Sequence, residues 1–286
     1  MYFFFKNIYK NPKSSAMAMF FVLSVMFFVL LFFETRSLDG KFVFAMLDVG
    51  QGDALFIQSP TGTQVLIDGG PPRKLLGALA EVVPSFDRYI DVVIMTHPDT
   101  DHIGGLKELL DFYEVGMIFQ SGVATDSIVY KNISQKIAEK NILNILARKG
   151  TRIDLGGDTY LDILFPDRDV YDWETNSASV VTRLSFGNLS FLLTGDAGIE
   201  TENILLENTA EQFLKSVYLK AGHHGSKTSS SFPFVQKVSP RFALVSAGKN
   251  NSYGHPHREV LDILNSLGVQ VLRTDVLGSV VVKFGF

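Results

Sequence analysis

The chain has 286 residues, no cysteine and a formal charge of −4. This length suits one large domain or two small ones, and the lack of cysteine excludes disulfides, zinc–thiolate sites and a cysteine nucleophile. Beyond residue 40 the chain carries 22 basic and 28 acidic residues, a net charge of −6, so it lacks the basic surface typical of extensive nonspecific binding to nucleic acid.

Uncharged, mostly apolar residues fill the segment from Ala16 to Phe33. Eighteen such residues meet the lower limit for a helix that crosses a bilayer. The preceding lysines, Lys6, Lys10 and Lys13, predict a cytoplasmic N-terminus and an extracytoplasmic remainder. We therefore expect residues 1–40 to form a transmembrane anchor. A signal segment that is cleaved before secretion and a soluble helix are the alternatives.

From Lys41 the sequence changes to short β-type runs that are broken by turn residues. The pattern predicts an antiparallel meander of three strands, at Phe42–Leu47, Ala54–Ser59 and Gln64–Asp68. Helices and strands then alternate: a helix near Lys74–Val83, a buried-type strand at Asp91–Thr96, a helix after Gly105, a strand at Met117–Phe119 and a helix at Ser127–Lys140.

The second half of the chain repeats this order. Strands come first, in TYLDILFP, SASVVTRLSFG and LSFLLTGD, and alternating elements follow, with helices over Ile199–Leu214, Ser230–Val238 and Arg258–Leu267 and strands at Ser216–Gly222, Phe242–Gly248, VQVLRT and SVVVKF. Two mixed halves predict an α/β domain over residues 41–286, with two sheets packed face to face and helices outside.

All six histidines follow expected strands, where α/β scaffolds form their sites. The stretch THPDTDHIGG contains His97, Asp99, Asp101 and His102 in six consecutive positions. If the chain stays extended, His97 and Asp99 point to the same side, and the other pair follows the turn. Such clusters suit two divalent ions. A solvated acidic loop is the alternative.

Two later motifs supply further ligands. Asp196 ends the strand in LLTGD and is the natural bridging carboxylate, although an Asp here also suits a helix N-cap. In HHGS, one of His223 and His224 would reach a metal while its neighbour faces the substrate. A polar surface turn is the alternative reading. Ser226 and Lys227 would contact substrate or begin the next helix.

The motif NSYGHPH offers groups on the far side of the site. His255 or His257 would donate a proton to the leaving group, and Asn251 and Tyr253 would hydrogen-bond a phosphate oxygen, unless the motif is only a turn and a helix cap. We expect the aspartates of DVGQGD and VLIDGG to support the metal ligands without contacting metal themselves. They are Asp48, Asp53 and Asp68. For DVGQGD a purely structural hairpin turn is the alternative.

The motifs HPDTDHIGG, LLTGD and LKAGHHGS resemble the metallo-β-lactamase superfamily, and DVGQGDA, VLIDGG and NSYGHP resemble the hydrolase domain of the ComEC family of competence proteins. The likeness covers nearly all of residues 42–286 in the right order. It implies an αββα sandwich with two divalent metal ions at one edge. The ligands it implies are His97, Asp99, Asp101, His102, Asp196 and one of His223 and His224.

Two departures from the superfamily pattern affect the metal. Asp99 stands where HxHxDH has its middle histidine, and no histidine occurs between His102 and His223, where Asn176 is at the nearest comparable location. Oxygen ligands are harder than imidazole and shift preference from zinc toward manganese or magnesium, although zinc tolerates such mixed sets. We therefore expect Zn²⁺ or Mn²⁺.

These features predict a metal-dependent hydrolase, namely a phosphodiesterase or nuclease in which two metals activate a water and Asp101 orients it. The negative charge favours short substrates, such as single-stranded DNA or a small phosphodiester. A single candidate membrane segment gives no ground for DNA transport. Hydrolysis of a lactam, lactone or thioester is one alternative, and a catalytically silent surface binding domain is another.

Overall fold

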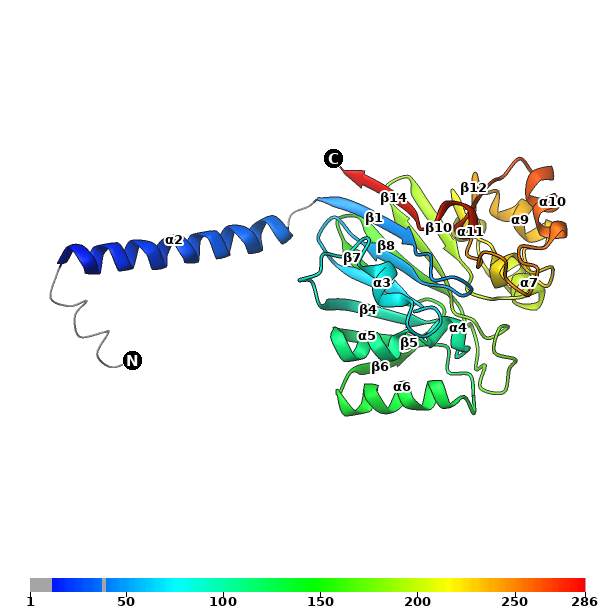
Figure 1. Cartoon of the computed structure of the whole chain (residues 1–286). Helices are drawn as coiled ribbons and strands as arrows, with labels where there is room; N and C mark the ends of the chain where they lie inside the picture. The colour runs from blue at the N-terminus through cyan, green and yellow to red at the C-terminus, as the bar shows by residue number, and fades with distance from the viewer. Residues whose placement is uncertain (1–11, 38–39, 286) are drawn as a thin grey trace.

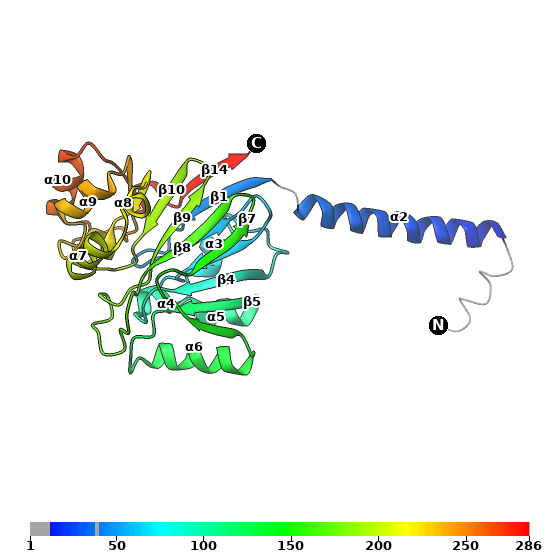
Figure 2. The ribbon, with the colours of Figure 1, turned by 180° about the vertical axis from the view of Figure 1, so that it is seen from behind.

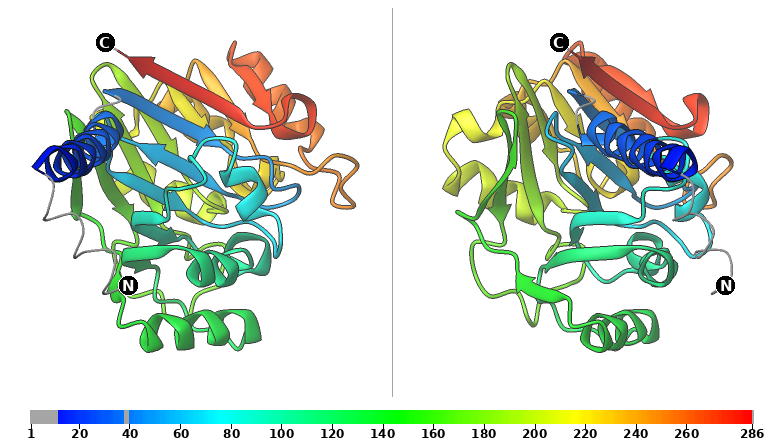
Figure 3. Two further views of the ribbon diagram at one scale, coloured as in Figure 1. Left: turned by 60° about the vertical axis from the view of Figure 1, so that its left-hand side comes forward. Right: turned by 90° about the vertical axis from the view of Figure 1, so that its left-hand side faces the viewer.

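The computed structural model describes residues 12–37 and 40–285. Beyond residue 40, two seven-stranded sheets lie face to face with helices outside, so the predicted αββα architecture is confirmed (Figures 1 and 3). The strand orders are β14-β1-β2-β3-β4-β5-β6 in the first sheet and β13-β12-β11-β10-β9-β8-β7 in the second.

The first sheet contains the predicted meander, because β1, β2 and β3 pair antiparallel before β3 to β6 continue in parallel. Its strands are β1 (Lys41–Met46), β2 (Leu55–Gln58), β3 (Gln64–Ile67), β4 (Tyr89–Met95), β5 (Glu114–Gln120), β6 (Leu143–Leu146) and β14 (Val280–Gly285). The helices along this half are α3 (Leu75–Leu79), α4 (Thr100–Ile103), α5 (Leu106–Phe112) and α6 (Ile128–Glu139).

The second sheet is antiparallel from β7 to β10 and parallel from β10 to β13. Its strands are β7 (Arg152–Gly156), β8 (Thr159–Phe165), β9 (Val181–Phe186), β10 (Leu189–Leu193), β11 (Tyr218–Lys220), β12 (Phe242–Val245) and β13 (Gln270–Arg273). The helices are α7 (Ile199–Asn208), α8 (Glu211–Leu214), the 3₁₀ turn η1 (Gly222–Gly225), α9 (Phe232–Val238), α10 (Arg258–Ser266) and α11 (Thr274–Leu277); Figure 2 shows α7, α8, α9 and α10 together on this side.

Alternating side chains of β1 explain how the sheets pack. Phe42, Phe44 and Met46 belong to the core between the two sheets, whereas Val43 and Ala45 belong to the core under helices α3 and α5. This is the period of two expected for a strand that is buried on both faces. Rings from the opposite sheet complete the inner layer, because Phe191 stacks on Phe44 with centroids 4.3 Å apart.

The N-terminal segment forms helix α2 (Pro12–Ser37), which projects away from the sandwich (Figure 1). Its large apolar side chains from Met17 to Phe28 are exposed. Among the residues that the structure describes, no helix combines the length and hydropathy required to cross a bilayer. The predicted anchor thus stays a prediction, and Lys6 and Lys10 lie outside the described residues.

Candidate metal centre

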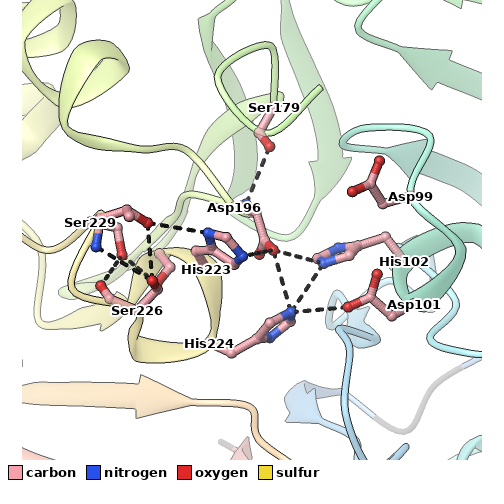
Figure 4. Close-up of polar contacts among 12 residues, drawn as sticks. Asp99, Asp101, His102, Ser179, Asp196, His223, His224, Ser226 and Ser229 are labelled. Atoms are coloured by element: carbon pink, nitrogen blue, oxygen red, sulfur yellow. Dashed lines mark hydrogen bonds and ion pairs between the residues drawn. The ribbon is translucent and has the colours of Figure 1, made fainter. Parts of the chain in front are cut away.

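Four buried side chains from four separate loops meet at the edge where strands β4 and β10 end. Asp53, His102, Asp196 and His224 each place one ligand atom within 4.8 Å of all the others. Asp196 lies at the middle, with its Oδ2 3.3 Å from the Nε2 atoms of both His102 and His224, as Figure 4 shows. A carboxylate between two imidazoles is the arrangement of a bridging metal ligand.

His97 adds a neutral donor beside this group. Its Nδ1 lies 3.0 Å from Thr96 Oγ1 and 3.3 Å from Ser179 Oγ, while its buried Nε2 has no hydrogen-bond partner. Burial, reinforced by the neighbouring His102, lowers the pKa of His97 to about 3. The ring is therefore neutral at pH 7.

Buried atoms without hydrogen-bond partners test whether these residues fit a metal. They include the Nε2 of His97, the Oδ1 of Asp196 and both carboxylate oxygens of Asp53. Leaving a polar atom buried and unpaired costs about 1–3 kcal/mol, so several such atoms in one cluster call for a ligand. Imidazole nitrogens and carboxylate oxygens without thiolate match the donors that Zn²⁺ and Mn²⁺ accept.

Asp99 and Asp101 close the cluster on its solvent side. Their side chains are 41% and 39% exposed. Asp99 Oδ2 lies 3.9 Å from His97 Nε2, and Asp101 Oδ2 lies 3.4 Å from His224 Nε2. The structure thus brings together the four residues of the THPDTDHIGG stretch with Asp196 and His224.

The structure separates the two histidines of HHGS. His224 is buried in the cluster, and its Nδ1 points to the carbonyl oxygen of Ser246 at 3.1 Å, which leaves Nε2 toward Asp196. His223 is 30% exposed, and its Nε2 lies 3.8 Å from Asp196 Oδ2. His224 therefore lies inside the cluster and His223 at its rim.

A strained turn presents these histidines. His223 and His224 have φ values of 45° and 55°, in the left-handed region that non-glycine residues seldom adopt, at a cost of order 1–3 kcal/mol each. The carboxylate of buried Glu202 supports the turn, because it accepts hydrogen bonds from the backbone N–H groups of Ser230 and Ser231. Sequence reasoning missed Glu202, which reads simply as part of an acidic helix.

Asp68 lies against His102 on the side of the ring that faces away from Asp196. Its Oδ2 lies 2.8 Å from His102 Nδ1, and its two oxygens also accept from the N–H and hydroxyl of Thr96. The contact fixes the ring so that Nε2 faces Asp196. Supporting contacts of this kind set the tautomer of metal-binding histidines.

The two aspartates of DVGQGD separate. Asp53 is buried beside His224, with Oδ1 3.4 Å from Nδ1 of that ring. Asp48 is exposed, and its Oδ1 accepts from the N–H of Gly50, which makes it a turn residue away from the cluster. Gly52 allows the loop to pass the site, since a Cβ there would lie 2.0 Å from the carbonyl oxygen of Asp101.

Proton affinities in the cluster reflect its packed charges. Burial acts to lower the pKa of His102, but Asp196 and Asp68 outweigh it and hold that pKa well above the usual value. Burial also acts to lower the pKa of His224, but the carboxylates of Asp196, Asp101 and Asp53 outweigh it and raise that pKa to about 9. Without metal, each of the two rings is therefore protonated on both nitrogens at pH 7. A metal must displace protons from these rings to bind.

The NSYGHPH residues line the rim. The ring of His255 lies 5.6 Å from that of His223, its Nδ1 has no partner, and burial followed by the charge of His224 lowers the pKa of His255 to about 4. Tyr253 is exposed and stacks on His255. Asn251 instead holds the turn, because its amide bonds the backbone of Gly248 and His255.

Three other predicted residues serve the local backbone or point to solvent. His257 accepts a hydrogen bond from the N–H of Lys227 through Nδ1, and the Lys227 side chain is exposed. Ser226 is buried, and its Oγ accepts from the N–H and hydroxyl of Thr228. Asn176, near the position of the missing histidine, has a buried Oδ1 with no partner.

Residues 47–116 match the family described as the metallo-beta-lactamase superfamily. A solved metallo-beta-lactamase fold protein, YhfI from Bacillus subtilis, superposes with a TM-score of 0.57 at 14% identity, over 85% of this chain and 100% of its own. The chain thus carries a metallo-β-lactamase domain and has the corresponding fold. The fold thus agrees with the expectation from the motifs.

Within the superfamily, the chain resembles competence proteins. ComE operon protein 3 of Bacillus subtilis is 31% identical over 97% of this chain and 37% of its own length. Competence protein ComA of Neisseria gonorrhoeae is 30% identical over 83% of this chain and 31% of its own length. The chain therefore spans about a third of the curated relatives that it matches.

Proposed function

We propose that this chain is a metal-dependent phosphodiesterase that cleaves short single-stranded DNA. The observation that carries the proposal is the buried cluster of imidazoles and carboxylates around Asp196, with unpaired His97 Nε2 and Asp196 Oδ1 facing it. The relative that is named for competence supports a DNA substrate. Oxygen-rich ligand sets of this kind suit hard divalent cations, and such cations in turn bind phosphoryl oxygens.

When bound, two divalent ions would supply an activated water and positive charge for the phosphate oxygens. His97 and Asp99 would hold one ion, His102 and His224 the other, and Asp196 would bridge. Asp101, which is partly exposed beside His224, would orient the water. Its carboxylate can accept a hydrogen bond, and its position on the solvent side matches that role.

At the rim, His255 would donate a hydrogen bond to the leaving oxygen. The pKa of about 4 makes its ring neutral at pH 7, so the donor is an N–H of imidazole and not an imidazolium. His223 and exposed Tyr253 flank this ring and would contact the substrate. His257 and Asn251 would act by holding the loop in place.

A cavity beside the cluster would receive the nucleotide next to the scissile bond. Its volume is about 710 Å³, within the range of small-molecule sites. It adjoins His97, because three of its residues also line the small recess at that histidine: Gln120, Val123 and Tyr130. The exposed ring of Tyr171 lies at the cavity and can stack on a base.

The test is turnover by the full chain, with Mn²⁺ or Zn²⁺, on a short single-stranded oligonucleotide and on bis(4-nitrophenyl) phosphate. We expect cleavage of both, and a loss of about 1,000-fold or more in Asp196→Asn. Asp262→Asn, at an exposed ion pair, is the matched control and should stay at the wild-type rate. Cleavage of a chromogenic lactam alone, or equal rates for wild type and Asp196→Asn, would contradict the proposal.

We also propose that residues 1–40 attach the domain to a membrane from the extracytoplasmic side. The support is the uncharged run from Ala16 to Phe33 together with the lysines that precede it.

A further inference from the structure

A fully buried lysine lies beneath the candidate metal centre. The Nζ of Lys220, at the end of β11, is 2.7 Å from Asp53 Oδ2, and both side chains are at most 1% exposed. The ammonium also donates to the carbonyl oxygens of Gly195 at 3.2 Å and Ala221 at 3.0 Å. Two backbone carbonyls and one carboxylate thus surround the ammonium group, the carboxylate as its ion-pair partner.

These three contacts join the three motifs that build the site. Gly195 precedes the bridging Asp196, Ala221 precedes the turn that bears His224, and Asp53 ends DVGQGD. The second oxygen of Asp53 lies 3.4 Å from Nδ1 of His224, opposite the Nε2 that faces Asp196. The ammonium of Lys220 therefore fixes the carboxylate of Asp53, and this carboxylate lies against Nδ1 of His224.

The position of Asp53 is compatible with either of two roles. It belongs to the group of four side chains with ligand atoms within 4.8 Å, so a metal could take it as a ligand. Lys220, however, already takes one of its oxygens, and a buried ammonium close to divalent cations is tolerable only if a carboxylate neutralises it. The remaining oxygen faces His224.

We propose that Lys220 is an internal counter-cation which keeps Asp53 off the metals and makes it a positioning residue for His224. The inference rests on the proposed metal centre. It assigns Asp53 to holding the Nδ1–H tautomer of His224, together with the carbonyl of Ser246, so that Nε2 stays free to bind metal.

A double-mutant cycle in metal affinity separates the two roles of Asp53. The full chain and its Asp53→Asn, Lys220→Met and doubly substituted variants are titrated with Mn²⁺, with free Mn²⁺ counted by electron paramagnetic resonance. We expect Asp53→Asn to weaken binding about 100-fold, because it leaves an unpaired ammonium beside the cations. The Mn²⁺ affinity of the double variant should return to within about 10-fold of the wild-type value. The affinity of Lys220→Met should lie within the same range.

A double variant that binds Mn²⁺ as weakly as Asp53→Asn would overturn the inference, because removing Lys220 cannot restore a lost metal ligand. If a variant does not fold, a manganese-soaked crystal of the wild-type chain decides. An Asp53 oxygen at about 2.2 Å from an ion overturns the proposal, and one that stays on Lys220 supports it. Metal binding without phosphodiester cleavage would defeat the proposed function alone, whereas a chain that binds no Mn²⁺ would defeat both.

Discussion

At the scale of single residues, the site depends on which nitrogen of each histidine is free. Asp68 takes Nδ1 of His102, the Ser246 carbonyl takes Nδ1 of His224, and hydroxyl groups surround Nδ1 of His97. All three Nε2 atoms are therefore left for a shared ligand. His257 differs from these three histidines, because its Nδ1 accepts a hydrogen bond from the backbone N–H of Lys227. Its role is therefore to hold the local backbone.

The raised histidine pKa values predict that stability depends on pH differently with and without metal. In the metal-free chain the pKa of His224 is about 9 against 6.5 in an unfolded chain, so the stability it contributes is present below pH 6.5 and is lost as pH rises through 9. We expect the melting temperature in EDTA to fall between pH 6.5 and 9, measured by scanning calorimetry.

The zinc-loaded chain should not show this fall, because its imidazoles are already neutral and bound to metal. Metal binding at pH 7 should also release protons, visible as a dependence of the calorimetric binding enthalpy on the ionisation enthalpy of the buffer. A metal-free melting temperature that is flat or rises over this range would be inconsistent with protonated His102 and His224.

At the scale of elements, the DVGQGD loop shows why a glycine can matter as much as a ligand. Gly52 has φ +124° and would place a Cβ 2.0 Å from the Asp101 carbonyl, whereas Gly50 has φ +81° and open space around it. We expect Gly52→Ala to cost about 3 kcal/mol or more and Gly50→Ala about 1 kcal/mol, from urea unfolding. Equal losses would mean that contact with Asp101 is unimportant.

The loop that follows β8 carries Tyr171 to the cavity beside His97. We expect Tyr171→Ala to raise KM for a short single-stranded oligonucleotide about 10-fold, since stacking on one base contributes about 1–3 kcal/mol, while KM for an abasic oligonucleotide stays unchanged. Phe112→Ala, at an exposed ring on α5, is the control. An equal rise for both substrates would argue against a base in this cavity.

Local sequence predicted most of the elements and the main motifs, but not how they pair. The edge strands β6 and β7 escaped notice because they are only four and five residues long. In DVGQGD the two aspartates look equivalent, and only the fold sends Asp53 inward and leaves Asp48 in a turn. The pairing of Lys220 with Asp53 likewise links positions that are distant in the chain, which no local pattern encodes.

At the scale of the whole molecule, the sandwich buries its own core and helix α2 stands apart from it (Figure 1). We expect residues 41–286 to fold alone and to remain in the aqueous phase with lipid vesicles, while the full chain partitions into them, as measured by flotation. Flotation of the shortened chain, or none of the full one, would contradict the proposed anchor.

In the proposed metal centre, distant loops converge on two cations. Anomalous diffraction at the manganese and zinc absorption edges from metal-soaked crystals of the full chain would locate these cations. We expect two peaks about 3.5–4 Å apart that share Asp196, with His97 Nε2 on one and the Nε2 atoms of His102 and His224 on the other. No peak among these residues, with their rings still paired as in Figure 4, would contradict it.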